Sequence, residues 1–218
     1  MQHGVIRRVR ATASKTLPRP LVAAWQVREW DRHGQPRPVP PAVKQREIRR
    51  FARLASISTL VETGTYLGLT VDAMKGTFQR IYSVELDETL FLQAKSKFAK
   101  YPHITILQGD SGEVLRVLLE QVSCPCLFWL DAHYSGGETA RGPEDTPILK
   151  ELQIIFDHPQ PNHVVLIDDV PDFNGTNGYP TVEVVESFVR SRRPEWEFCL
   201  QYDIMRIHPK SLEITAAR

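Results

Sequence analysis

The fold is decided by the stretch Thr59-Leu60-Val61-Glu62-Thr63-Gly64-Thr65-Tyr66-Leu67-Gly68. A short apolar run ends in an acid, two glycines follow, and Val71 and Met74 continue with helical spacing. This order predicts a strand, a tight loop and the N-terminus of a helix. Gly64 allows a positive φ, and Gly68 lets the helix start pack near the strand, so the loop amides can face a polar ligand. The stretch therefore indicates a nucleotide-binding turn, although an ordinary strand-to-helix turn has the same pattern.

Strands and helices alternate along the rest of the chain. Strands are predicted at 59–62, 80–85, 104–108, 126–131 and 164–168, and helices at 43–54, 70–78, 89–100, 112–121, 147–156 and 181–192. This alternation predicts a parallel sheet with helices on both faces. Segments 196–200 and 204–208 are separated by only three residues, too few for a crossover and enough for a hairpin. The predicted fold class is α/β: Rossmann-like, with a mostly parallel seven-stranded sheet and a C-terminal antiparallel hairpin.

Charge is distributed unevenly along the chain. The net charge is +1, yet residues 1–50 hold 12 Lys and Arg against 3 Asp and Glu, which leaves 15 against 23 in the remainder. We interpret residues 1–42, with the proline-rich segment 35–41, as a basic N-terminal arm and linker, and residues 43–218 as the folded domain. Such an arm can meet nucleic acid, an anionic membrane surface or an acidic partner, or can be a solvated extension.

The sequence says less about the cellular compartment and the oligomeric state than about the fold. No run of about 18 apolar residues occurs, so no transmembrane segment is predicted. Three cysteines are too few for a disulfide framework. No apolar segment follows Arg7-Arg8, which argues against secretion, so we expect a cytoplasmic protein. A short helix is predicted at 21–30, and its tryptophans, Trp25 and Trp30, are compatible with a homodimer or with an intramolecular contact.

Acidic residues lie at or just after the predicted end of each parallel strand. They are Glu62, Glu85, Asp110, Asp131 and the pair Asp168-Asp169. Ligands of open α/β sheets collect at the carboxyl ends of the strands, so these acids are candidate binding residues. Glu85 can accept both hydrogens of a ribose diol, whereas capping of the next helix fits Asp87 better. Either Asp110 or Ser111 can cap its own helix, which is the alternative to ligand binding.

The last three acids predict a metal site. Asp131 and Asp168 would end neighbouring strands, which lie about 4.8 Å apart, and Asp169 adjoins Asp168. Carboxylates this close repel one another unless they protonate or a cation lies between them. Hard oxygen ligands at this density favour Mg²⁺ or another divalent ion. The alternative is that these acids cap helices or face solvent.

Three segments carry a resemblance to a known family. Glu62-Thr63-Gly64-x-x-x-Gly68 resembles the first motif of class I S-adenosylmethionine (SAM) methyltransferases. Segments 128–133 (FWLDAH) and 165–169 (VLIDD) resemble those of metal-dependent O-methyltransferases, particularly the macrocin O-methyltransferase-like group, which modifies sugar hydroxyls. The resemblance covers about residues 57–208. It implies a metal site at Asp131, Asp168 and Asp169 and a SAM site formed by Glu62, Gly64, Thr65, Gly68, Glu85, Asp110, Ser111 and Asp131.

The implied activity is methyl transfer to a hydroxyl of a small polyhydroxylated acceptor, such as a sugar or glycosylated metabolite. His133, two residues after Asp131, is a candidate general base in the same catalytic site, because an unperturbed histidine has a pKa of about 6.5. The sugar-modifying group commonly has an Asp at this place, so base, metal-ligand and structural roles for His133 all stay open. Two other functions remain: an RNA or polyanion methyltransferase that uses the basic arm, and a non-catalytic SAM-binding partner module.

Overall fold

A computed structural model of the chain describes residues 19–131 and 146–212. The described residues form two compact units, which divide between Glu47 and Ile48. The first unit contains helix α2 (Arg19–Arg32) and the start of helix α3 (Pro41–Leu54). Among the described residues, no helix has the combination of length and apolar content that crossing a lipid bilayer requires.

The segment between α2 and α3 is held by side-chain contacts and is one residue shorter than the predicted linker. Trp30 Nε1 donates a hydrogen bond of 2.7 Å to the carbonyl oxygen of Pro36, and Asp31 pairs with Arg46 at 3.4 Å. The extended segment expected through Pro41 ends at Pro40, because Pro41 is the first residue of α3. Proline suits that position, since its fixed φ is helical and its missing N–H would have no partner within the helix.

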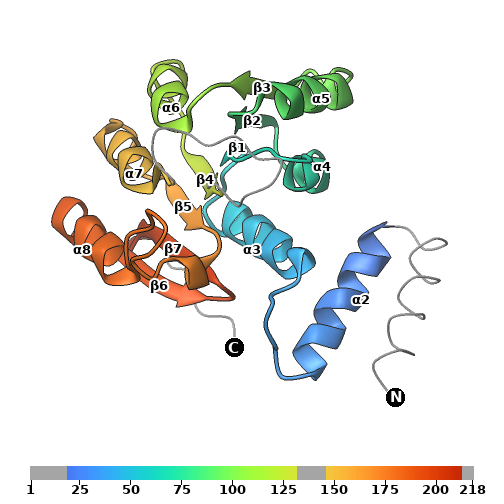
Figure 1. Cartoon of the computed structure of the whole chain (residues 1–218), viewed down its shortest axis with the longest axis horizontal. Coiled ribbons are helices and arrows are strands. Elements are labelled where there is room, and N and C mark those ends of the chain that lie inside the picture. Colours follow the sequence, from blue (N-terminus) through green and yellow to red (C-terminus); the bar gives the residue numbers. More distant parts are fainter. Residues whose placement is uncertain (1–18, 132–145, 213–218) are drawn as a thin grey trace. The chain divides into compact units, whose positions relative to one another are not determined.

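The second unit is built on a seven-stranded sheet with the order β3-β2-β1-β4-β5-β7-β6 (Figure 1). Its strands are β1 (Thr59–Thr63), β2 (Arg80–Glu85), β3 (Ile104–Gln108), β4 (Cys126–Leu130), β5 (Val164–Ile167), β6 (Trp196–Gln201) and β7 (Ile204–Pro209). Strands β1 to β5 pair in parallel, whereas β7 pairs antiparallel with β5 and with β6. The predicted sheet and hairpin are confirmed. Because β2 and β4 flank β1 on opposite sides, the topological switch lies between β1 and β4.

Helices cover both faces of the sheet (Figure 1). They are α4 (Leu69–Met74), α5 (Glu88–Phe98), α6 (Ser111–Leu119), α7 (Ile148–Asp157), α8 (Val182–Arg192) and the 3₁₀ turn η1 (Val170–Asp172). Helices α6, α7 and α8 pack on one face, and α4, α5 and the part of α3 from Ile48 onward pack on the other. The helix predicted over 70–78 ends at Met74, because Lys75-Gly76 follows and glycine disfavours helix.

The central strand β4 shows why the sheet is buried on both sides. Its side chains Cys126, Phe128 and Leu130 join the core under α6, α7 and α8, while Leu127 and Trp129 join the opposite core. Continuous apolar strands of this kind belong in sheets covered on both faces. The result is a rigid platform whose carboxyl edge carries the acids described below.

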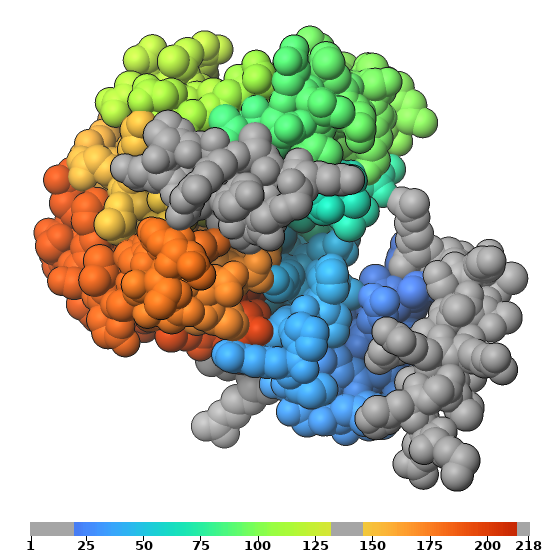
Figure 2. All heavy atoms as spheres, viewed as in Figure 1, coloured from blue at the N-terminus to red at the C-terminus, as the bar shows by residue number. Residues whose placement is uncertain are grey.

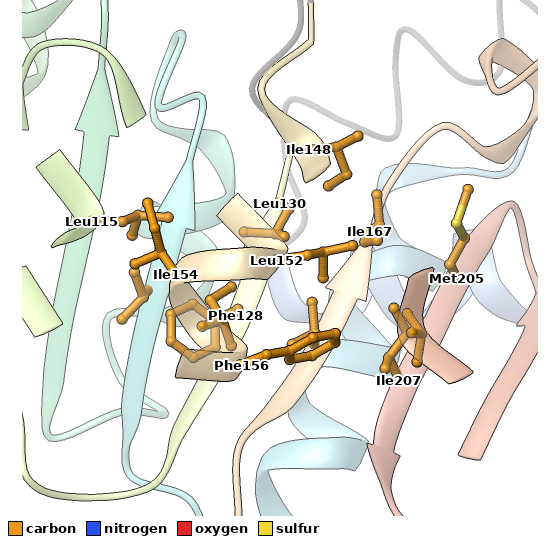
Figure 3. Packing of buried hydrophobic residues seen from close by; sticks show 14 of the residues in the cluster. Leu115, Phe128, Leu130, Ile148, Leu152, Ile154, Phe156, Ile167, Met205 and Ile207 are labelled. Carbon is orange, nitrogen blue, oxygen red and sulfur yellow. The ribbon is translucent and has the colours of Figure 1, made fainter. Parts of the chain in front are cut away.

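Helix α7 is fixed firmly against this platform. Its Ile148 and Leu152 pack among Leu130 of β4 and Ile167 of β5 (Figure 3). Helices α6 and α7 also lie side by side in the space-filling view, as neighbouring yellow-green and yellow-orange surfaces (Figure 2). This packing sets the position of any polar side chain that α7 directs at the edge of the sheet.

Candidate cofactor and metal site

The glycine turn after β1 is held by backbone bonds to β2. The N–H groups of Gly64 and Thr65 donate to the carbonyl oxygen of Val84 at 3.0 and 3.2 Å. Gly64 has a φ of 84° and Gly68 a φ of 64°, which favour glycine. A Cβ at Gly68 would lie 2.7 Å from Cε2 of Phe98 on α5. The close approach expected at Gly68 is therefore present, but its partner is helix α5 rather than the strand.

Glu85, the last residue of β2, is fixed by two backbone donors. Its Oε2 accepts from the N–H of Tyr66 at 2.7 Å, and its Oε1 accepts from the N–H of Asp87 at 3.0 Å. Tyr66 has a φ of 46°, an uncommon conformation for a bulky residue, which the bond to Glu85 stabilises. Asp87 caps α5 by accepting from the N–H of Leu90 at 2.9 Å, as expected. Each carboxylate oxygen of Glu85 retains a lone pair for a ligand.

Glu62 ends a buried chain of polar side chains. Thr65 and Ser83 share a hydrogen bond of 2.6 Å between their hydroxyls, and the Ser83 hydroxyl donates to Oε2 of Glu62. Burial raises the pKa of Glu62 to about 8; the Ser83 bond opposes this rise, and the nearby Asp131 adds to it. The carboxyl is thus mostly protonated at neutral pH, and a cation placed beside it would favour the ionised form.

Asp110 and Ser111 begin helix α6. Asp110 occupies the N-cap position, but its side chain makes no capping bond. Its Oδ1 is buried without a hydrogen-bond partner. Ser111 is buried as the first residue of the helix. Helix capping therefore does not account for the Asp110 side chain.

The acids at the ends of β4 and β5 converge. Asp131, Asp168 and Asp169 each offer one carboxylate oxygen, and these oxygens all lie within 4.8 Å of one another. The parallel ladder sets this geometry, because Asp131 N–H donates to Thr63 O at 3.1 Å and Asp168 N–H donates to Leu130 O at 3.0 Å. Asp169, with a φ of 56°, then turns the chain into η1. The convergence expected from the sequence is present, and its hard oxygen donors fit a divalent cation such as Mg²⁺.

Sequence reasoning missed two features of this edge. Glu151 of α7 is only 1% exposed and lies among groups at the carboxyl ends of β1, β3 and β4. The signal in the sequence that could have found it is an acid within the apolar stripe of the helix. The turn of the β6–β7 hairpin is also here, because Val170 N–H donates to Asp203 O at 3.1 Å. Tyr202 and Asp203 both have positive φ, of 59° and 58°, as a two-residue hairpin turn requires.

One predicted residue cannot be placed. His133, with the loop 134–145, lies outside the described residues. Its role as general base, ligand or structural residue stays a prediction.

Comparison with known proteins identifies the fold. No family model and no curated protein matches the chain. An O-methyltransferase of Streptomyces achromogenes involved in tomaymycin synthesis, solved with SAM, is similar over 93% of this chain and 95% of its own, with TM-score 0.58 and 18% identity. An O-methyltransferase of Bacillus cereus, solved with S-adenosylhomocysteine (SAH), matches 92% and 97%, with TM-score 0.59 and 14% identity. A SAH-bound methyltransferase of Podospora anserina matches 96% and 97%, with TM-score 0.56 and 16% identity. The chain therefore has the class I methyltransferase fold that these proteins share.

Proposed function

We propose that this protein is a SAM-dependent, divalent-metal-assisted O-methyltransferase. Its acceptor, in this proposal, is a small polyhydroxylated molecule such as a sugar or glycosylated metabolite. The observation that carries the proposal is the convergence of Asp131, Asp168 and Asp169 beside the glycine turn, at the switch-point edge of a methyltransferase sheet. Carboxylates in that position suit an ion that binds and orients a hydroxyl acceptor.

The proposed cofactor residues bind different parts of SAM, according to the chemistry of each side chain. Glu85 is oriented by its two backbone bonds to accept the ribose diol. Glu62, buried behind Gly64, ionises when the ammonium of the cofactor lies beside it, because a neighbouring cation favours the carboxylate. Thr65 and Gly68 shape the turn that faces the cofactor, and the start of α6 at Asp110 and Ser111 receives the adenine.

The proposed reaction is an in-line displacement. Asp131, Asp168 and Asp169 would hold a divalent ion, which would lower the pKa of the acceptor hydroxyl when bound. The hydroxyl oxygen forms a bond to the methyl carbon while the bond from that carbon to sulfur breaks, so the electron pair moves to sulfur and SAH results. The hydroxyl proton leaves to a base, for which His133 is the candidate. The rigid strand ends contribute by holding the reactants in one orientation.

The first test is metal binding by calorimetry with purified, metal-stripped protein. Asp168→Asn removes one charge and keeps the shape, so it should weaken Mg²⁺ binding at least about tenfold, or about 1.4 kcal/mol. SAH affinity should change much less. Asp157→Asn, an exposed acid at the far end of α7 that pairs with Arg192, is the matched control. Equal Mg²⁺ affinity in all three proteins would refute the metal part of the proposal.

The second test identifies the acceptor class. Methyl transfer from labelled SAM should require a divalent ion and should favour acceptors with two neighbouring hydroxyls over their mono-hydroxylated analogues. Transfer to RNA alone, declining steeply with salt, would instead favour the polyanion methyltransferase. SAH binding with no transfer to any acceptor would favour the non-catalytic module.

A further inference from the structure

Helix α7 carries an acid where an apolar side chain would pack better. Ile148, Leu152 and Ile155 line the face that packs on the sheet, and Glu151 belongs to the same buried stripe. A buried carboxyl group costs free energy unless it is paired. Oε1 of Glu151 is nevertheless without a hydrogen-bond partner. An acid retained at such a position suggests that a ligand group completes its hydrogen bonding.

Two further partnerless atoms lie beside it. Six buried side-chain atoms lack partners among the described residues, and three of them are Thr63 Oγ1, Asp110 Oδ1 and Glu151 Oε1. Thr63 ends β1 and Asp110 precedes α6. The hydroxyls of Thr63 and Ser111 and the charge of Asp110 lie close enough to Glu151 to influence its pKa, although Thr63 Oγ1 and Glu151 Oε1 make no hydrogen bond, so the three orphan atoms share one neighbourhood. Buried polar atoms are nearly always hydrogen-bonded, so such a group calls for an occupant.

The chemistry of the orphan atoms defines that occupant. Two are carboxyl oxygens and one is a hydroxyl oxygen, so the complement is a group that presents more than one N–H. SAM has two such groups, the exocyclic amine of adenine and the α-ammonium. The adenine is attached to the ribose, which Glu85 at the end of β2 would hold, and Asp110 follows the neighbouring strand β3.

We propose that Glu151 is a cofactor-binding residue that, together with Asp110, accepts hydrogen bonds from the exocyclic amine of the adenine ring. Thr63 adds its hydroxyl to the same group of polar atoms. This inference rests on the proposed function, because it takes SAM as the cofactor. It adds a residue from helix α7 to a site otherwise formed by the strand ends and the loops that follow them.

The test compares two ligands on matched variants by calorimetry. One ligand is SAH, and the other is its analogue in which inosine replaces adenosine, so that a carbonyl oxygen replaces the amine. The wild-type protein should bind SAH at least about tenfold more tightly, the effect of leaving buried acceptors without a donor. Glu151→Gln offers an N–H to the carbonyl and should lower this preference at least about fivefold.

Glu151→Leu supplies an independent measurement. Leucine keeps the stripe apolar, so the variant should fold with an unchanged or higher melting temperature, bind SAH about tenfold more weakly and prefer it less over the inosine analogue. The control is Glu113→Gln, an exposed acid of α6 that pairs with Lys150, which should keep the wild-type preference.

The outcomes separate the two proposals. If the wild-type protein binds SAH and both Glu151 variants keep its preference for adenine, the assignment of Glu151 is wrong, and a structural or water-binding role explains its position. If the folded wild-type protein binds no SAH, the proposed function fails as well.

Discussion

A buried histidine, His163, pairs with the half-buried His158 at the opposite edge of the sheet and makes stability depend on pH. The N–H of Cys126 donates to Nδ1 of His163 at 3.1 Å, so the proton of neutral His163 is on Nε2, which lies 2.9 Å from Nδ1 of His158. His158 Nε2 then donates to the carbonyl oxygens of Leu119 and Val122, at 3.1 and 2.9 Å. Every ring nitrogen therefore has a partner while His163 is neutral, and a proton on its Nδ1 would remove the bond from the Cys126 N–H.

The size of the stability loss at low pH follows from the pKa of His163. Burial is the main cause that lowers it from 6.5 to about 3, and His158 adds to the effect. The unfolded chain thus takes up a proton below pH 6.5 that the folded chain takes up only near pH 3. Stability from this group is complete above pH 6.5 and is lost as pH falls. At about 1.4 kcal/mol per pH unit, the loss between pH 7.5 and 5 is about 2 kcal/mol.

Other groups act in the opposite sense, so the assay must isolate His163. Glu62 and Glu151 have pKa values raised to about 8 and about 7. The folded state holds their protons more tightly, so they stabilise it as pH falls from 7.5 to 5. His163→Asn keeps an acceptor for the Cys126 N–H and removes the titrating ring, while both acids remain. The contribution of His163 is the difference between wild type and variant.

We therefore expect the free-energy difference between wild type and His163→Asn, measured by urea unfolding, to fall by about 2 kcal/mol from pH 7.5 to 5. The acids cancel in this difference, because distant sites add independently. A difference that stays the same at both pH values would refute the argument, since it would mean that His163 titrates equally in the folded and unfolded chains.

Three further predictions test the core and the cofactor turn. Gly68→Ala should destabilise the protein by about 1–2 kcal/mol because the backbone at this position is left-handed, and the clash with Phe98 should add to this loss. Unfolding curves should show the lower stability, and SAH titrations should show a lower affinity. Leu152→Ala, at a fully buried position on the inner face of α7, should cost about 2–5 kcal/mol in urea unfolding, and a smaller loss would mean that the core is less tightly packed there. SAH affinity should rise as pH increases from 6.5 to 8, because the ammonium of SAH favours the ionised form of Glu62, whose pKa is about 8. Calorimetry in buffers of different ionisation enthalpy should detect the proton that Glu62 releases on binding, and Glu62→Gln should abolish this release.

The sequence was sufficient for the acids at the strand ends because strand geometry is local. Apolar runs bounded by turn residues located β1, β4 and β5, and the carboxyl ends of parallel strands meet at one edge. Asp131 and Asp168 therefore had to be neighbours once β4 and β5 were paired. The turn at Gly64 and Gly68 could also be predicted from the sequence, since glycine by itself tolerates the positive φ that the turn requires.

Glu151 and the β6–β7 turn could not be found in this way. An acid on a helix is normally assigned to the solvent face, and only the packing of α7 decides that this one points at Thr63 and Ser111. The hairpin was predicted, but not the edge at which its turn lies, because that depends on β7 running antiparallel to β5. The partner of Gly68 was likewise decided by a helix thirty residues later in the chain.

The amino-acid sequence by itself thus determined the α/β class, the order of strands and helices, and the acidic strand ends, since each depends on periodicity and turn chemistry within a few residues. The tertiary structure alone decided which carboxylates lie within reach of one another, which side chains lose water and change pKa, and which buried atoms lack partners. These properties depend on distances between segments far apart in the chain, and such distances are set by the packing of helices on the sheet.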